Sequence, residues 1–279
     1  MAEQFMAEQP NEADGPDRSQ AVVIVGGGVM GGAIASGLAA DGWTNVTVVE
    51  PTETRRAELA DEFGLKAVAG ADEIAESPDV VAIVVKPKVA PSVCEQVTPL
   101  IADRTLVMSM CAGVTLGELE ANLPDAVPLV RVMPNTPAQV GKGMSALSPN
   151  PHVSDEQLAL ADALMQAVGE TMVVPESLQD AVTGVSGSGP AYVFYLAEAL
   201  IEAGVQVGLT RAQADKLARQ TIIGSAQLLA SGEHPTILRE RVTSPGGTTA
   251  AAIRELDAHA TRAAVSDAVW AAYRRSRGE

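Results

Sequence analysis

Residues 21–31 read AVVIVGGGVMG, an uninterrupted apolar run that ends in a glycine-rich turn. A short apolar run with β-branched residues is typical of a parallel strand covered on both faces. In the turn, Gly26, Gly28 and Gly31 have the spacing of a dinucleotide-binding fingerprint. Gly26 permits the tight bend, Gly28 lets the backbone approach a pyrophosphate, and Gly31 allows the next helix to pack closely on the strand. We therefore expect dinucleotide binding by the turn and the start of this helix, namely Gly26, Gly28, Val29, Met30 and Gly31.

The following residues alternate between strand-like and helix-like segments. Strands are expected at 46–50, 79–85, 105–110 and 128–133, with helices between them at 54–63 and 89–101. This alternation predicts right-handed crossovers and an α/β fold with a doubly wound parallel sheet. A loop at 148–151, a helix at 154–168 and an edge strand at 171–175 complete a domain that we place at 21–178.

The C-terminal segment, 179–279, shows helical patterns alone. Helices are expected at 190–204, at 210–232, which opens with a capping-box spacing, and from 248 to the C-terminal end. They are rich in alanine and apolar on more than one face, so a homodimer interface is the simplest use of the surplus apolar surface. The polar residues 1–20 lack a periodic apolar face, and we expect a disordered tail there.

Composition narrows the class of protein. The 279 residues suggest two domains, and 47% hydrophobic with 19% charged residues is typical of folded chains. A net charge of −16 argues against nucleic acid and anionic lipid as partners. The sequence shows neither an apolar run near the roughly 18 residues of a membrane span nor a secretory leader. Two cysteines suit a reducing compartment, so we expect a cytoplasmic protein.

The second predicted strand ends at Glu50, about 20 residues after the glycine turn. A carboxylate there accepts hydrogen bonds from adenosine ribose hydroxyls and repels a 2′-phosphate, which favours NAD. Arg55 and Arg56 follow one helical turn later and suit a 2′-phosphate, which favours NADP. A solvated strand end with an exposed arginine face is the structural alternative. We expect NADH to serve at least as well as NADPH.

Polar residues also follow three other predicted strands. The strand predicted at 79–85 is followed by Lys86 and Pro87. The strand at 105–110 ends in the stretch Ser109 to Gly113, which includes Ala112, and the strand at 128–133 is followed by Asn135. Ligands of open α/β sheets bind at the carboxyl ends of the strands, so we expect these residues to line a cofactor site.

Two further glycine-rich stretches, SGSGPAY at 186–192 and SPGGTT at 244–249, precede predicted helices. Backbone N–H groups and hydroxyls at a helix start form an anion site suited to a carboxylate, although each stretch could merely cap its helix. His152, His234 and His259 lack the spacing of metal ligands, so we expect no metal site.

From Ala21 to about Arg277 these segments together resemble the pyrroline-5-carboxylate reductase family, above all in DAVTGVSGSGPAY at 180–192 and VTSPGGTT at 242–249. The resemblance implies an N-terminal Rossmann-type domain and an all-helical C-terminal dimerisation domain. It implies that the chain forms at least a homodimer. Many members of the family assemble as five dimers. The cofactor residues implied are Gly26 to Met30, Lys86 and Asn135. The residues implied to bind the substrate carboxylate and ring nitrogen are Ser244, Gly246, Gly247, Thr248 and Thr249.

The activity implied by this resemblance is hydride transfer from NADPH or NADH to 1-pyrroline-5-carboxylate, giving L-proline in the last step of proline biosynthesis. A protonated cyclic imine is already an electrophile, so positioning supplies most of the catalysis and no buried general acid is required. Glu50 departs from the family, since many relatives place a small polar residue there.

Two other functions are compatible with the layout. β-Hydroxyacid dehydrogenases share it, but they carry a catalytic Lys in a Gly-x-x-x-Lys helix, and neither Gly187 nor Gly189 has a Lys at that distance. A dinucleotide-sensing protein without turnover is also compatible, because the fold alone implies no reaction. The loop at 244–249 argues against a sensor, which needs no second ligand site.

Overall fold

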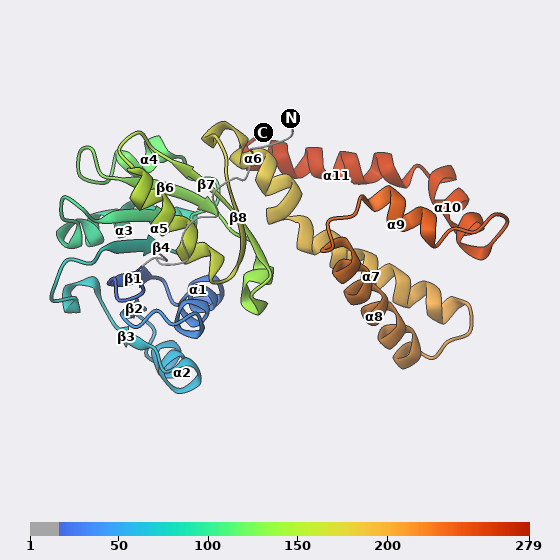
Figure 1. Cartoon of the computed structure of the whole chain (residues 1–279). Helices are drawn as coiled ribbons and strands as arrows, with labels where there is room; N and C mark the ends of the chain where they lie inside the picture. The colour runs from blue at the N-terminus through green and yellow to red at the C-terminus, as the bar shows by residue number, and fades with distance from the viewer. Residues whose placement is uncertain (1–16) are drawn as a thin grey trace, which may run out of the picture. The chain divides into compact units, whose positions relative to one another are not determined.

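The computed structural model describes residues 17–279, which form two compact units, one ending at Gln179 and the other spanning Asp180–Glu279 (Figure 1). Most of the expected tail, residues 1–20, lies outside the described residues. Its last four residues are described, and among them Arg18 forms an ion pair with Asp41 at 3.0 Å.

An eight-stranded sheet forms the centre of the first unit, in the order β3-β2-β1-β4-β5-β6-β7-β8. The strands are β1 (Val22–Val25), β2 (Val46–Val49), β3 (Lys66–Val68), β4 (Val80–Ile83), β5 (Leu106–Ser109), β6 (Leu129–Met133), β7 (Gly143–Pro149) and β8 (Gly169–Val173). Neighbours pair in parallel except β6 and β7. The order reverses at β1, which lies between β2 and β4, and this is the arrangement of a doubly wound dinucleotide-binding sheet.

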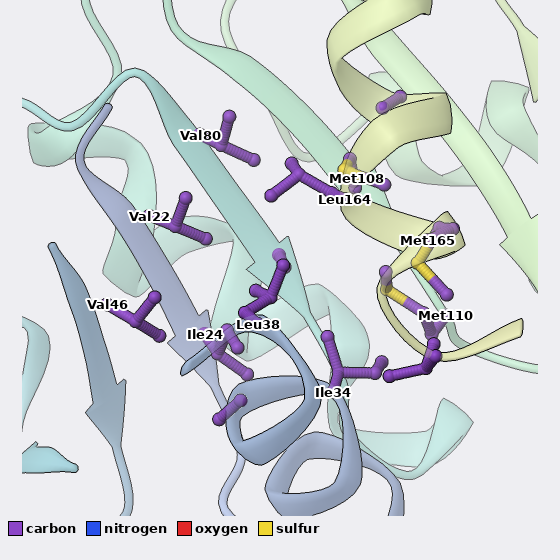
Figure 2. Packing of buried hydrophobic residues seen from close by; sticks show 14 of the residues in the cluster. Val22, Ile24, Ile34, Leu38, Val46, Val80, Met108, Met110, Leu164 and Met165 are labelled. Atoms are coloured by element: carbon purple, nitrogen blue, oxygen red, sulfur yellow. The ribbon is translucent and has the colours of Figure 1, made fainter. Parts of the chain in front are cut away.

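Helices cover both faces of this sheet. They are α1 (Val29–Ala40), α2 (Glu53–Phe63), α3 (Ala90–Val97), α4 (Leu116–Glu120) and α5 (Asp155–Gln166). Side chains alternate along β1, so Val22 and Ile24 face α1, while Val23 and Val25 belong to a second core cluster with α3 and α4. Figure 2 shows Ile34 and Leu38 of α1 packed on the first face. The apolar burial on both faces explains why these strands read as uninterrupted apolar runs.

The predicted α/β fold is confirmed, with two strands beyond the prediction. β3 has only three residues, none of them buried, and therefore lacks a strong apolar signal. β7 reads GMSALSP and pairs with β6 and β8; most of its residues are buried, but its small and polar side chains form no apolar pattern. The expected loop at 148–151 is wrong at its start, because Ser148 and Pro149 belong to β7.

The second unit is helical. It begins within α6 (Gln179–Val182), whose first residue ends the first unit. The elements that follow are a π-helical turn at Thr183–Gly187, α7 (Gly189–Gln206), α8 (Arg211–Leu229), α9 (Pro235–Arg241), α10 (Thr248–Ala258) and α11 (Thr261–Ser276). The capping box predicted before α8 is present: Thr210 Oγ1 accepts from the Gln213 N–H at 3.3 Å. The single helix expected from 248 onward is wrong, since Ala260 adopts a left-handed φ of +52° and separates α10 from α11. Along residues 17–279, no helix combines the length and apolarity that crossing a membrane requires.

Candidate active site

The glycine turn lies where the strand order reverses. The Val84 N–H donates to the Val25 carbonyl at 2.8 Å, so β1 and β4 end together. Gly26 has a φ of +108°, which favours glycine, and a Cβ at this position would clash with the Val84 carbonyl oxygen. The tight bend expected at Gly26 therefore follows from both its backbone conformation and its neighbour. Ligands of open α/β sheets bind at this position.

The start of α1 is open toward ligand. Gly28 is its N-cap, without a side-chain capping bond, and a Cβ built at Gly28 would have no atom within 4 Å. Gly31, by contrast, lies so close to the turn that a Cβ would clash with the Gly26 carbonyl oxygen. The exposed Gly28 and the free N–H groups of the first helical turn thus form a cradle that fits a pyrophosphate.

Gly27 is a site residue that the fingerprint does not single out. Its N–H donates to Glu50 Oε2 at 3.0 Å, and its carbonyl accepts from Arg55 Nε at 2.7 Å. A Cβ there would lie 2.8 Å from Leu59 Cδ1. The sequence signal is the surplus of glycine in GGGVMGG, which exceeds the three positions that the fingerprint requires.

Glu50 lies at the end of β2 and is only 9% exposed. Its second carboxylate oxygen, Oε1, accepts from the Thr52 N–H at 2.9 Å. Burial alone would raise the pKa of Glu50, but the donors on Thr52 and Gly27 and the Arg55 guanidinium outweigh it, and the pKa lies below its ordinary value. The carboxylate is therefore ionised at neutral pH beside the glycine turn.

The two arginines after Glu50 are half-buried and contact the same region. Arg55 reaches Gly27 and also forms an ion pair with Glu58 at 2.8 Å. Arg56 Nη1 donates to the carbonyls of Glu50 and Pro51, each at 2.8 Å. The structure thus brings Glu50 and both arginines to the end of β2.

The other predicted cofactor residues follow neighbouring strands at the same edge. Lys86 and Pro87 are exposed after β4, and Ala112 is exposed after β5. Asn135 follows β6 and is half-buried, and its Oδ1 accepts from the Met144 N–H at 2.9 Å. The sheet therefore brings all these loops to the carboxyl ends of β1, β4, β5 and β6.

The loop at 244–249 belongs to the second unit and leads into α10. A tight turn forms where the Gly247 N–H donates to the Ser244 carbonyl at 3.0 Å, and Gly246 has a φ of +68°. A Cβ at Gly247, the N-cap, would clash with Ser244 Oγ. Thr248 is exposed and Thr249 half-buried at the start of the helix. Hydroxyls and free N–H groups thus share one helix N-terminus.

A cavity of about 1010 Å³ lies at the opposite edge of the sheet, beside the residues that precede β1, β4, β5 and β6. Four acidic residues and one arginine line it: Asp17, Asp79, Asp103, Glu156 and Arg104. Its acidic lining does not suit dinucleotide phosphates.

Comparison with known proteins agrees with this geometry. The family model described as pyrroline-5-carboxylate reductase dimerisation matches residues 176–279, and that described as NADP oxidoreductase coenzyme F420-dependent matches residues 21–113. The pyrroline-5-carboxylate reductase of Synechocystis is 45% identical, covering 91% of this chain and 96% of the relative. The pyrroline-5-carboxylate reductase of Escherichia coli is 41% identical, covering 88% of this chain and 93% of the relative.

Solved structures give the same result. A pyrroline-5-carboxylate reductase from Coxiella burnetii has a TM-score of 0.88 at 35% identity and covers 93% of this chain and 98% of that one. The Plasmodium falciparum pyrroline carboxylate reductase, solved with NADP bound, has a TM-score of 0.81 at 31% identity, covering 94% and 98%. These relatives give no support to the β-hydroxyacid dehydrogenase or sensor interpretations. The chain belongs to the pyrroline-5-carboxylate reductase family and is an NAD(P)H-dependent oxidoreductase.

Proposed function

We propose that this chain reduces 1-pyrroline-5-carboxylate to L-proline with a hydride from NADPH or NADH. The observation that carries the proposal is the match to named reductases of this family over nine-tenths of the chain, joined to the open glycine cradle at the end of β1. Oxidation of reduced cofactor in the presence of the cyclic imine, with proline as product, tests it. Turnover of a β-hydroxy acid with oxidised cofactor, or cofactor binding without turnover, would contradict it.

The cofactor residues that we propose surround the carboxyl edge of the sheet. Gly26 to Gly31 hold the pyrophosphate, and Glu50 and Arg55 lie toward the adenosine end. Lys86, Pro87, Ala112 and Asn135 line the neighbouring strand ends. When bound, the reduced nicotinamide supplies the hydride.

The substrate residues that we propose are Ser244, Gly246, Gly247, Thr248 and Thr249. N–H groups at the start of α10 bind the substrate carboxylate, since a helix N-terminus attracts anions. The Thr249 hydroxyl forms a hydrogen bond at the ring nitrogen. The imine is protonated before reduction, so the loop has only to orient an electrophile that already exists.

Assembly follows from the surface of the second unit. α7 has no buried residue in the described chain, and large apolar side chains are exposed along α7 and α8, among them Phe194 (66%), Tyr195 (75%) and Leu228 (60%). The dimerisation family match covers these helices. We propose a homodimer through this surface, and five such dimers and a cytoplasmic location stay predictions.

A further inference from the structure

We propose that Glu50 is a positioning residue: with Arg55 it clamps the backbone of Gly27 on both sides of its Cα and sets the shape of the glycine turn for NADH and NADPH alike. This inference rests on the proposed cofactor site and adds to the ribose contact expected from the sequence. Discrimination between the two cofactors would then depend on other groups.

Both polar groups of the Gly27 backbone are held by side chains from outside the turn. The N–H donates to Glu50 Oε2 at 3.0 Å, and the carbonyl accepts from Arg55 Nε at 2.7 Å. Gly27 is buried, so these two partners replace the water that its backbone groups would otherwise bind. Two opposite charges, one at the end of β2 and one on α2, therefore fix the orientations of the two consecutive peptide groups that meet at the Gly27 Cα.

Further contacts hold the Glu50 and Arg55 side chains in place. Glu50 Oε1 accepts from the Thr52 N–H at 2.9 Å, so both carboxylate oxygens are engaged. Arg55 Nη1 pairs with Glu58 at 2.8 Å, and a Cβ at Gly32 would lie 2.6 Å from Arg55 Nη2. The guanidinium thus extends from the turn to the first turn of α1. Since the N–H groups of that turn are the proposed pyrophosphate donors, the clamp acts on the part that both cofactors share.

The two roles of Glu50 predict opposite outcomes. If the carboxylate acted only at the adenosine ribose, accepting from its hydroxyls and repelling a 2′-phosphate, removing its charge would strengthen NADP binding and weaken NAD binding. If it positions the turn, both cofactors lose affinity. Glu50→Gln separates these outcomes, because an amide has one acceptor oxygen for two N–H donors and turns its own NH₂ group toward the second.

The experiment measures dissociation constants of NAD⁺ and NADP⁺ by calorimetry on the full chain. Glu50→Gln and Arg55→Met are each compared with Glu53→Gln, which removes an exposed carboxylate at the start of α2. We expect both clamp variants to bind each cofactor about tenfold more weakly, with the ratio of the two constants changed less than about threefold. Glu53→Gln should bind like the wild type.

Hydrogen exchange of residues 26–31 in the cofactor-free protein supplies a second measurement. Exchange should accelerate in Glu50→Gln while the core strands stay protected, which also shows that the variant folds. Tighter NADP⁺ binding by Glu50→Gln, or unchanged exchange in both clamp variants, would overturn the clamp. Because neither measurement requires turnover, a chain that clamps Gly27 as described but reduces no imine would refute only the proposed reaction.

Discussion

Individual glycines of the turn have different tasks, and substitution distinguishes them. A Cβ at Gly28 would meet nothing, and its φ of −63° suits any residue, whereas a Cβ at Gly31 would clash with the Gly26 carbonyl oxygen. The free energy of unfolding of Gly28→Ala should therefore lie within about 0.5 kcal/mol of the wild-type value. The variant should bind cofactor less well, since the methyl group occupies the pyrophosphate cradle. Gly31→Ala should be clearly destabilised. Urea unfolding and cofactor titration of both variants check this, and equal stability of the two would refute the assignment.

Thr249 tests the proposed substrate loop. Thr249→Val keeps the shape of the side chain but removes the hydroxyl that we place at the ring nitrogen. Loss of a hydrogen bond to a charged substrate costs about 1.5–3 kcal/mol, so kcat/KM for the imine should fall about tenfold to hundredfold. Cofactor affinity should stay the same. Unchanged turnover with weakened cofactor binding would instead place the dinucleotide at this loop.

Glu50 gives the protein a pH dependence of known sign. Its pKa in the folded state lies below the ordinary 4.5, owing to its N–H donors and Arg55, while Arg56 contacts only its backbone carbonyl. The ionised Glu50 carboxylate therefore stabilises the folded state fully above about pH 4.5, and this contribution is lost as the pH falls through the folded-state pKa. The difference in Tm between wild type and Glu50→Gln should be largest near neutral pH and shrink below about pH 4.5. A difference that persists undiminished at pH 3 would contradict the contacts assigned to the carboxylate.

At the scale of elements, burial on both faces made β1, β2, β4, β5 and β6 predictable as apolar runs. β3 was not predicted because it is a short edge strand with no buried residue, and β7 was not predicted because small and polar residues make up most of it. The break between α10 and α11 was not predicted because the residue in the left-handed conformation is Ala260, and no glycine marks this position in the sequence. Local sequence thus predicts elements that bury apolar side chains and misses those determined by their neighbours.

A partly buried ion pair joins three elements of the first unit. Arg131 on β6, 7% exposed, pairs with Glu176 at 3.0 Å, and the same carboxylate oxygen accepts from the Leu116 N–H at 2.7 Å. Glu176→Gln removes the negative charge that is hydrogen-bonded to the buried guanidinium. Because Glu176 is itself 31% exposed, we expect a loss of about 1–3 kcal/mol in unfolding free energy.

Urea denaturation measures this loss, with Asp215→Asn as control. That variant breaks the exposed Arg219 pair on α8 and should change stability by less than about 0.5 kcal/mol. Equal effects of the two substitutions would show that burial gives the Arg131 pair no special weight.

At the scale of the whole molecule, the exposed apolar helices predict self-association. Light scattering at micromolar concentration should give at least twice the chain mass of 28.7 kDa. Trp270→Glu, on the 57% exposed indole of α11, should leave the first unit folded and weaken association if that side chain lies in the interface. A monodisperse species near 28.7 kDa in the wild type would refute the proposed homodimer.

The sequence located the cofactor loops because parallel strands carry their carboxyl ends to one edge, so strand order alone brings Gly26, Lys86 and Asn135 together. It did not show the clamp on Gly27, because that contact depends on how α2 packs across the turn. The substrate role of Ser244 to Thr249 came from resemblance, since a glycine-rich helix start by itself also serves as a cap.

Hydride transfer to the imine is the central claim, and isotope transfer tests it most directly. The purified chain is incubated with 1-pyrroline-5-carboxylate and cofactor deuterated at the transferred position of the nicotinamide, and proline is analysed by mass spectrometry. We predict one deuterium per proline, located at the former imine carbon, in equal amount to the cofactor oxidised. Oxidation of cofactor without deuterated proline, or tight cofactor binding with no proline formed, would contradict the account.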